Sequence, residues 1–209
     1  MKKLLIILCC GTALIVIAIG AVAWLSWQPQ SWYAPPDFSN PEVAKLADRA
    51  EYRLNEEFHK IRSVDDTWRL RITDEALNAW LSGRLEGWLT HDQEIEIPEE
   101  LQGMQVHATP TGLWIAAMVE LDDDAPRPVA VQLWITIEDS MARVSPKSIR
   151  LGKVPIPISV FKQILEEVQQ KTDAIACVVP LMDDREVQIH EIVFEEGALV
   201  LTCQTHLPQ

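Results

Sequence analysis

The sequence predicts an α+β domain, with a curved antiparallel sheet and helices packed on one face of it, preceded by one N-terminal transmembrane helix. Three observations predict this class. The 24 residues from Leu4 to Trp27 are almost entirely apolar and carry no charge. Apolar residues then recur at helical spacing over 43–61 and 77–88. From Met104 onward the spacing changes to two, which is typical of strands.

These patterns divide the chain into three parts. Residues 1–27 are predicted to be a cytoplasmic tip and transmembrane anchor, and residues 40–209 a single extracytoplasmic α+β domain. Between them, residues 28–39 contain three prolines and no periodic pattern. Such a segment is typical of a stiff spacer, so a stalk is expected that holds the domain off the membrane but close to it.

The apolar run is long enough to cross a bilayer. A helix of 24 residues is about 36 Å long, against about 30 Å for the hydrocarbon core. Lys2 and Lys3 precede the run and the next basic residue is Lys45, so the positive-inside rule keeps the N-terminus in the cytoplasm. The predicted location is the cytoplasmic (inner) membrane, with the domain outside. The alternative is a secretory signal cleaved after the small residues at 21–23, which leaves the domain on the same side.

The charge of the chain excludes one class of partner. The chain has 18 basic and 31 acidic residues, and without Lys2 and Lys3 the remainder has 16 and 31, a formal charge of −15. An acidic surface repels the phosphates of nucleic acid and of anionic lipid surfaces. No nucleic-acid partner is therefore expected, and the membrane contact is assigned to the apolar run alone.

Cysteine usage leaves two alternatives open. Cys9 and Cys10 belong to the apolar run, so Cys177 and Cys203 are the cysteines of the predicted domain. In an oxidising compartment Cys177 and Cys203 are able to form a disulfide, and two free thiols are the other possibility.

The first elements of the domain begin at helix-capping residues. Asn40 followed by Pro41 is typical of a helix start and predicts a helix to Ile61. Residues 68–72 alternate and predict a short strand. Residues 73–75 (Thr-Asp-Glu) then cap and charge the start of a second helix, whose apolar stripe consists of Leu77, Trp80, Leu81, Leu85 and Trp88.

Two alternating strands, 113–121 and 129–137, are predicted on either side of a turn. That turn holds three consecutive aspartates, but it lacks the alternating ligand spacing of the common calcium loop. No metal site is therefore predicted there.

The C-terminal third predicts an edge strand, a helix and a hairpin. Strand character continues over 142–154, and the prolines at 155 and 157 remove ladder donors, which indicates an edge or crossover. A third helix is predicted over 160–174. The runs 186–194 and 198–205 are predicted to form a final hairpin.

Several of these motifs resemble one family. The segment 72–81 (Ile-Thr-Asp-Glu-Ala-Leu-Asn-Ala-Trp-Leu), the segment 151–158 (Leu-Gly-Lys-Val-Pro-Ile-Pro-Ile) and the closing hairpin are similar to the YpmS-like family of membrane-anchored bacterial proteins, whose function is unassigned. The resemblance covers most of 72–202, and the helix at 41–61 has no counterpart in it. By analogy it implies a tubular lipid-binding (TULIP-like) fold, in which a curved antiparallel sheet wraps a helix around an apolar groove.

The candidate site is apolar. The aliphatic face of the strands and the stripes of the second and third helices are expected to line a groove for lipid or another apolar ligand, unless they pack as a dry core. The candidate lining residues are Leu77, Trp80 and Leu81 of the second helix, Val131, Leu133 and Ile135 of the strand 129–137, and Phe161, Ile164 and Leu165 of the third helix.

A different class of function rests on two tryptophans. Trp114 and Trp134 project from the strand face opposite the aliphatic row, and if exposed they indicate an envelope scaffold or regulatory ectodomain that binds a protein. Cys203 and His206, with Cys177 and His190, have no recognised zinc spacing. Without a catalytic or metal motif, no catalytic residue, metal or cofactor is predicted, and the chain is not expected to be an enzyme.

Overall fold

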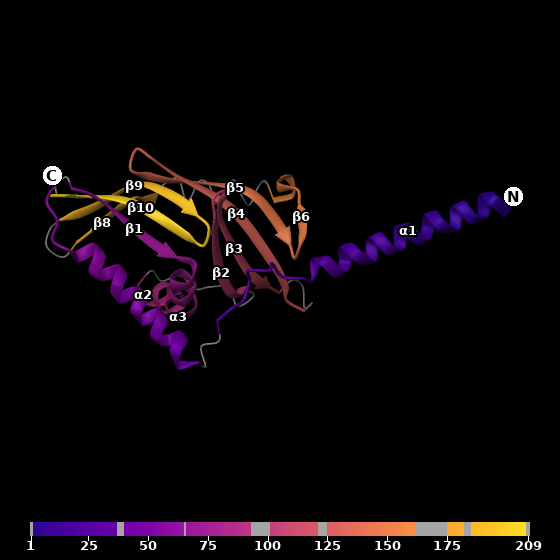
Figure 1. The fold of residues 1–209 in the computed structure, drawn as a ribbon, viewed down its shortest axis with the longest axis horizontal. Helices are drawn as coiled ribbons and strands as arrows, with labels where there is room; N and C mark the ends of the chain where they lie inside the picture. The colour runs from indigo at the N-terminus through magenta and orange to yellow at the C-terminus, as the bar shows by residue number, and fades with distance from the viewer. Residues whose placement is uncertain are drawn as a thin grey trace.

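The computed structural model describes residues 2–36, 40–64, 66–92, 101–120, 125–161, 175–181 and 185–207. Within these ranges the chain forms three α-helices and two antiparallel sheets (Figure 1). The predicted α+β class and antiparallel pairing are confirmed. The prediction of one curved sheet is wrong, because the strands divide between a sheet of four strands and a sheet of six.

The four-stranded sheet has the order β1–β10–β9–β8. Its strands are β1 (Thr67–Thr73), β8 (Val178–Pro180), β9 (Glu186–Glu195) and β10 (Ala198–His206). The predicted final hairpin is therefore confirmed as β9–β10. β1 pairs with β10, with Leu70 opposite Leu201, although the two strands lie at opposite ends of the domain sequence. Because of this long-range pairing, the C-terminal hairpin belongs to the four-stranded sheet and not to the sheet that contains β2 to β6.

The six-stranded sheet has the order β2–β3–β4–β5–β6, and the short strand β7 pairs with the start of β5. The bounds are β2 (Leu101–Thr109), β3 (Gly112–Val119), β4 (Arg127–Glu138), β5 (Met141–Leu151), β6 (Val154–Ile156) and β7 (Ile175–Ala176). β6 contains Pro155 and lies at the edge of this sheet, as its prolines predict.

Both helices of the domain begin where their capping residues predict. In α2 (Pro41–His59) the side chain of Asn40 accepts a 3.0 Å hydrogen bond from the backbone N–H of Glu42. In α3 (Asp74–Asp92) the hydroxyl of Thr73 accepts a 3.3 Å bond from the N–H of Ala76. The predicted third helix falls on the short 3-10 helix η1 (Ile158–Phe161) and on residues 162–174, which lie outside the described residues. The aspartates of the predicted 122–126 turn lie outside them too.

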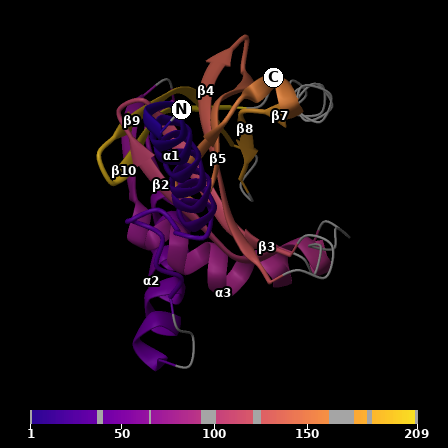
Figure 2. The same cartoon turned by 90° about the vertical axis from the view of Figure 1, so that its right-hand side faces the viewer.

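α2 and α3 lie below the strands of the domain in Figure 2. Leu54 and Phe58 of α2 pack on a core of the four-stranded sheet formed by Leu70, Leu181, Val187, Leu201 and Cys203. The two helices are joined by Arg84 of α3, whose guanidinium pairs with Asp48 and lies 3.2 Å from a carboxylate oxygen of Glu51.

The two sheets meet at the start of α3. The backbone N–H of Gly197, in the β9–β10 turn, donates a 2.9 Å bond to the carbonyl of Ala108 in β2. The N–H of Asp74 donates to the carbonyl of Gly197 at 3.0 Å, and the carboxylate of Asp74 accepts a 3.0 Å bond from the N–H of Ala108. These bonds tie one helix and both sheets at a single point.

α1 (Lys2–Ser26) extends away from the domain (Figure 1). Within the described residues, no helix combines the length and apolarity needed to cross a membrane. The predicted span, 4–27, also includes residues 4–10, whose side chains lie outside the described ones.

The expected stalk packs on the domain over residues 28–36. The side-chain amide of Gln105 accepts a 2.8 Å bond from the N–H of Ala34 and donates a 3.0 Å bond to its carbonyl. The amide of Gln30 donates to the carbonyl of Gly152, and Trp32 and Tyr33 pack against Trp114 and its neighbours on the outer face of the six-stranded sheet. This part of the chain is therefore not a free spacer, because its polar and aromatic groups find specific partners on the sheet. Residues 37–39 lie outside the described residues.

Candidate functional site

Three of the nine predicted lining residues lie in a filled core. Leu77 and Leu81 of α3 and Ile135 of β4 pack against a buried cluster formed by Val106, Ala108, Leu113 and Phe194. At these three positions the space between helix and sheet is occupied by protein side chains, which is the dry-core alternative.

The other six residues are placed differently. Val131 and Leu133 of β4 are half-buried. They lie opposite Ile115 and Leu113 of β3, respectively. Trp80 is half-buried on α3, and Phe161 is half-buried at the end of η1. Ile164 and Leu165 lie outside the described residues.

A cavity of about 550 Å³ lies between α2, β1 and the first turn of α3. None of the seven predicted residues that the structure describes lines it. Its apolar walls come from α2 and from the strand β1 that faces it, and they include Leu46, Ala50, Leu54, Leu70 and Ile72. Leu46, Ala50 and Leu54 are four residues apart on α2, so one face of the helix supplies all three. We call this space the α2–β1 cavity.

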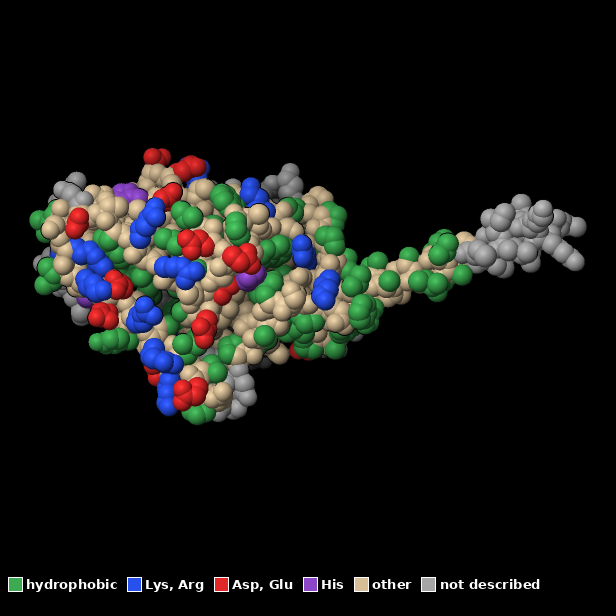
Figure 3. Space-filling view, in the orientation of Figure 1, with side chains coloured by type: hydrophobic (Ala, Val, Ile, Leu, Met, Phe, Trp, Pro, Cys, Tyr) green, Lys and Arg blue, Asp and Glu red, His purple; other side chains and the backbone are tan. Residues whose placement is uncertain are grey.

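Four arginines surround the α2–β1 cavity. Arg49 and Arg53 are one helical turn apart on α2, and Arg69 and Arg71 alternate along β1. In Figure 3 Lys and Arg side chains are spread over the visible face of the domain, with acidic groups among them. Because Leu70 and Ile72 pack with Leu54 of α2, the alternating side chains of Arg69 and Arg71 point to the face of the sheet away from α2.

Two acidic residues, Glu57 and Glu75, also line the cavity. The carboxylate of Glu57 is bound by Lys60 and by Arg62, whose Nη2 lies 2.9 Å from Oε2, and the hydrogen bond from Lys60 is the main reason that the pKa of Glu57 is lowered. Glu57 is thus engaged by cations that do not line the cavity.

The arginines themselves differ in their partners. Arg71 Nε lies 3.2 Å from Oε2 of Glu195, and Arg49 Nε donates a 3.2 Å bond to the carbonyl of Lys45. Among the described residues, neither Arg53 nor Arg69 has an ion pair or a side-chain hydrogen bond.

Sequence reasoning missed this site because it treated the charges of the first helix as a solvated outer face. A partial signal is present in the pattern: Leu46, Ala50 and Leu54 recur every four residues, and Arg49 and Arg53 directly precede Ala50 and Leu54. What the pattern lacks is the knowledge that α2 packs beside β1.

A second polar cluster is centred on Asp74. One carboxylate oxygen binds the N–H of Ala108, and the other lies 2.6 Å from Nδ1 of His107. The His107 ring stacks on Trp32 with ring centroids 5.1 Å apart, and its Nε2 lies 3.7 Å from Glu196. Both oxygens of Asp74 thus hold the start of α3 to β2. The stacking of His107 on Trp32 connects the same cluster to the 28–36 segment.

The tryptophans that suggested a protein-binding face have different surroundings. Trp114 is buried beneath Trp32 and Tyr33, with the guanidinium carbon of Arg150 4.8 Å from its ring centroid. Trp134 is 37% exposed, and its ring centroid lies 5.8 Å from that of Phe194. The burial of Trp114 removes the argument for a partner site at that position.

Cys177 and Cys203 are buried, free thiols, so the disulfide that was one alternative is not formed. The two cysteines lie on opposite sides of strand β9. The carbonyl of Cys177 accepts a hydrogen bond from the N–H of Ile189 in β9, and Cys203 of β10 is the partner of the same Ile189 on the other side. Two strand spacings separate the cysteines by about 9.6 Å, beyond the roughly 7 Å between Cα atoms that a disulfide tolerates.

Both thiols are expected to be unreactive in the folded protein. Burial raises the pKa of Cys203 to about 11 and raises that of Cys177 as well. At pH 8 only about one Cys203 in a thousand is then a thiolate, which is the reactive form. In a Cys9→Ser/Cys10→Ser background, alkylation by iodoacetamide should be at least about a hundredfold slower in native than in urea-unfolded protein. Equal rates in the two states would contradict the burial of these thiols.

No family model matches the chain, and no curated protein matches its sequence. The resemblance to the YpmS-like family therefore stays a prediction.

Proposed function

We propose that the chain is a single-pass membrane protein whose extracytoplasmic domain binds lipid or another apolar ligand in the α2–β1 cavity. The observation that carries the ligand proposal is the cavity itself. Its volume of about 550 Å³ falls within the roughly 300–1,000 Å³ of small-molecule sites, and its walls combine aliphatic residues with a few polar groups.

The exposed surface of α1 supports the anchor. Leu14, Ile15, Val16 and Ile17 are consecutive, so they point to all sides of the helix, and each is 60–69% exposed. Figure 3 shows hydrophobic side chains along the described part of this helix. A helix that is apolar on every side requires an apolar surrounding, and a bilayer supplies one. The orientation follows from Lys2 and Lys3 at its start, which favour a cytoplasmic N-terminus.

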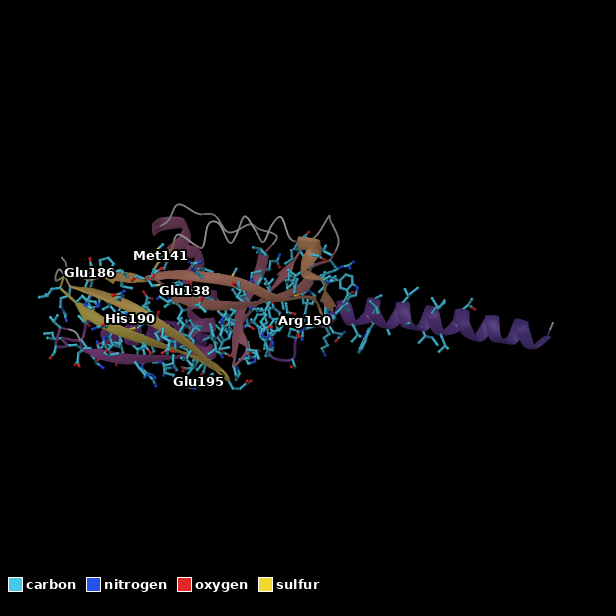
Figure 4. All side chains as sticks on the ribbon, turned by 90° about the horizontal axis from the view of Figure 1, so that it is seen from above. Glu138, Met141, Arg150, Glu186, His190 and Glu195 are labelled. Atoms are coloured by element: carbon cyan, nitrogen blue, oxygen red, sulfur yellow. The ribbon has the colours of Figure 1, made fainter. Side chains whose placement is uncertain are left out.

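The place of the cavity bears on how a ligand would be held. α2 and β1 lie toward the end of the domain away from α1 (Figure 1). In Figure 4 Arg150 lies near the α1 end, whereas Glu186, at the start of β9, lies at the opposite end. In the proposed arrangement a lipid in the cavity is therefore fully withdrawn from the anchoring bilayer.

Ala50→Trp is expected to block ligand binding, because the indole would fill the cavity between α2 and β1. The full chain would be purified from membranes into nanodiscs, and its binding of a fluorescent fatty acid measured along with the lipids released on native mass spectrometry. The variant should bind the probe at least about tenfold more weakly than wild type, since one buried methylene contributes about 0.8 kcal/mol and several lose their contacts.

Tyr52→Trp is the matched control, because Tyr52 lies on the same helix, is 68% exposed and does not line the cavity. It should bind the probe as wild type does. Wild-type protein that carries no lipid and binds no fluorescent fatty acid would refute the ligand proposal. Unchanged binding by Ala50→Trp, with its indole in place, would refute the α2–β1 cavity as the site.

A further inference from the structure

β1 is an edge strand of the four-stranded sheet, with β10 on one side and, among the described residues, no strand on the other. Five consecutive residues, Arg69–Thr73, line the α2–β1 cavity. Successive side chains of a strand point to opposite faces, so consecutive residues border one cavity only along the edge of the strand. The cavity therefore follows the open edge of β1, and the apolar side of α2 is its other wall.

The pairing of β1 with β10 determines which backbone groups face this open edge. The N–H of Asp74 donates to the carbonyl of Gly197, which lies opposite it when the register of the two strands is continued by one residue. Bonded residues alternate along an antiparallel pair, so every second residue back from Asp74 bonds to β10. The residues between them, Arg69 and Arg71, turn their N–H and carbonyl groups to the open edge. Within the described part of the chain these backbone groups have no hydrogen-bond partner.

An open edge of this kind is complementary to an extended peptide. All pairs in this sheet are antiparallel, and a peptide added in the same way exchanges backbone hydrogen bonds with Arg69 and with Arg71. Five residues of strand extend about 17 Å, so a peptide of five residues covers the part of β1 that lines the cavity. A lipid tail has no backbone groups to offer to this edge.

One face of the added strand meets an apolar wall. Leu70 and Ile72 point toward α2, where Leu54 packs on the same core. Every second side chain of a strand beside β1 points the same way and meets the α2 wall that includes Ala50 and Leu54. These peptide residues are therefore apolar.

The other face of the added strand lies beside two arginines. Directly opposite residues of an antiparallel pair have their side chains on the same face, so the peptide residues opposite Arg69 and Arg71 lie next to guanidinium groups. Arg71 Nε lies 3.2 Å from Oε2 of Glu195, whereas Arg69 is exposed and has no ion pair among the described residues. Acidic peptide residues are complementary to this charge.

We propose that the ligand of the α2–β1 cavity is an extended segment of a partner polypeptide, in which apolar and acidic residues alternate, and that it adds to the edge of β1 as a fifth strand of the sheet. This inference rests on the proposed function, whose ligand is lipid or another apolar ligand, and it selects a peptide with one apolar face. The backbone of Arg69 and Arg71 binds the peptide backbone, and Ala50 and Leu54 contact the apolar side chains.

The test uses acetyl-Leu-Glu-Leu-Glu-Leu-amide, whose blocked ends represent a segment within a polypeptide. It is titrated by calorimetry into the full chain in phosphatidylcholine nanodiscs, and the heat from protein-free nanodiscs is subtracted. Wild type should bind it at least about tenfold more tightly than the same peptide with lysine in place of both glutamates, because the lysines would meet Arg69 and Arg71. The glutamate peptide should also displace the fluorescent fatty acid, since both cover the same apolar wall.

N-methylation distinguishes strand addition from contact through side chains alone. In the proposed register the amides of both glutamates face β1, and the amide of the central leucine faces away from it. Methylation of both glutamate amides should weaken binding at least about tenfold, because it removes two donors to the edge of β1. Methylation of the central leucine amide is the matched control and should leave the affinity within about threefold of the unmodified peptide.

Arg69→Glu should remove most of the preference for the glutamate peptide over the lysine peptide. Lys147→Glu is the charge-matched control, because Lys147 is exposed on β5 and does not line the cavity. It should retain the preference. The urea midpoint of each variant, compared with that of wild type, shows that both are folded.

The outcomes separate this inference from the proposal on which it rests. If the fluorescent fatty acid binds and the glutamate peptide neither binds nor displaces it, the peptide is refuted and the apolar site stands. If neither the fatty acid nor the peptide binds, the proposed function fails as well. Binding that survives methylation of both glutamate amides refutes the addition of a strand to β1. A folded Arg69→Glu variant with the wild-type preference refutes the acidic face of the ligand.

Discussion

Gly112→Ala is expected to lower the free energy of unfolding of the domain by about 4 kcal/mol. Gly112 begins β3 with a φ of +129°, and a Cβ at this position would lie 2.4 Å from the carbonyl oxygen of Leu133. That oxygen belongs to the backbone of β4, which is paired with β3 on one side and β5 on the other. Because both strands are fixed by their ladders, the substitution must separate the start of β3 from β4, where Leu113 lies opposite Leu133.

The measurement is urea unfolding of the full chain in detergent, followed by tryptophan fluorescence. Gly197→Ala is the control, because Gly197 also has a positive φ, of +70°, but a Cβ there would have no atom within 4 Å. It should lower the free energy of unfolding by only about 1 kcal/mol, the cost of the left-handed conformation for alanine. Equal losses for the two variants would show that the approach of Leu133 is not the cause.

Local patterns in the sequence are sufficient for most single elements of this fold. Asn40-Pro41 predicts the start of α2 because a capping side chain and a fixed φ act over one turn. The alternation of apolar residues within β3, β4, β9 and β10 predicts strands because successive side chains of a strand point to opposite faces. The division into two sheets was not predictable in this way, because it depends on the pairing of β1 with β10 across most of the domain sequence.

Specific long-range contacts also explain why residues 28–36 of the stalk predicted over 28–39 pack on the domain. Prolines and the absence of periodicity describe only its own backbone. Its position is decided by the amide of Gln105, which pairs with both backbone groups of Ala34, and by the stacking of Trp32 on His107. Neither partner is recognisable before β2 is placed beside this segment.

At the candidate site the types of residue could be predicted from the sequence, but not which of them lie close together in the fold. The aliphatic rows on α3 and β4 predicted a groove, but Leu77, Leu81 and Ile135 meet a filled core. The cavity forms instead where α2 lies beside β1.

Gly152→Val is expected to increase the opening of the junction between α1 and the domain by roughly a hundredfold, equivalent to about 3 kcal/mol. Gly152 has a φ of +54°, and a Cβ there would lie 2.5 Å from the carbonyl oxygens of both Leu25 and Ser26. The next residue, Lys153, donates its backbone N–H to the carbonyl of Leu25 at 2.9 Å. A side chain at 152 would push the end of α1 away and break this bond.

Hydrogen exchange of the Lys153 amide in nanodiscs measures the opening directly, and proteolysis within 28–36 should accelerate in parallel. Lys153→Ala is the control, since its backbone N–H still donates to Leu25 and exchange should stay as slow as in wild type. Unchanged protection in Gly152→Val would mean that the helix end is not held by this turn.

A closed junction has a consequence for the proposed function: α1, the 28–36 segment and the six-stranded sheet then move as one body, so the anchor determines the direction in which the domain extends from the bilayer. If the chain is anchored and binds lipid as we propose, the α2–β1 cavity is thereby kept clear of the anchoring membrane, and a lipid would have to leave a membrane to reach it.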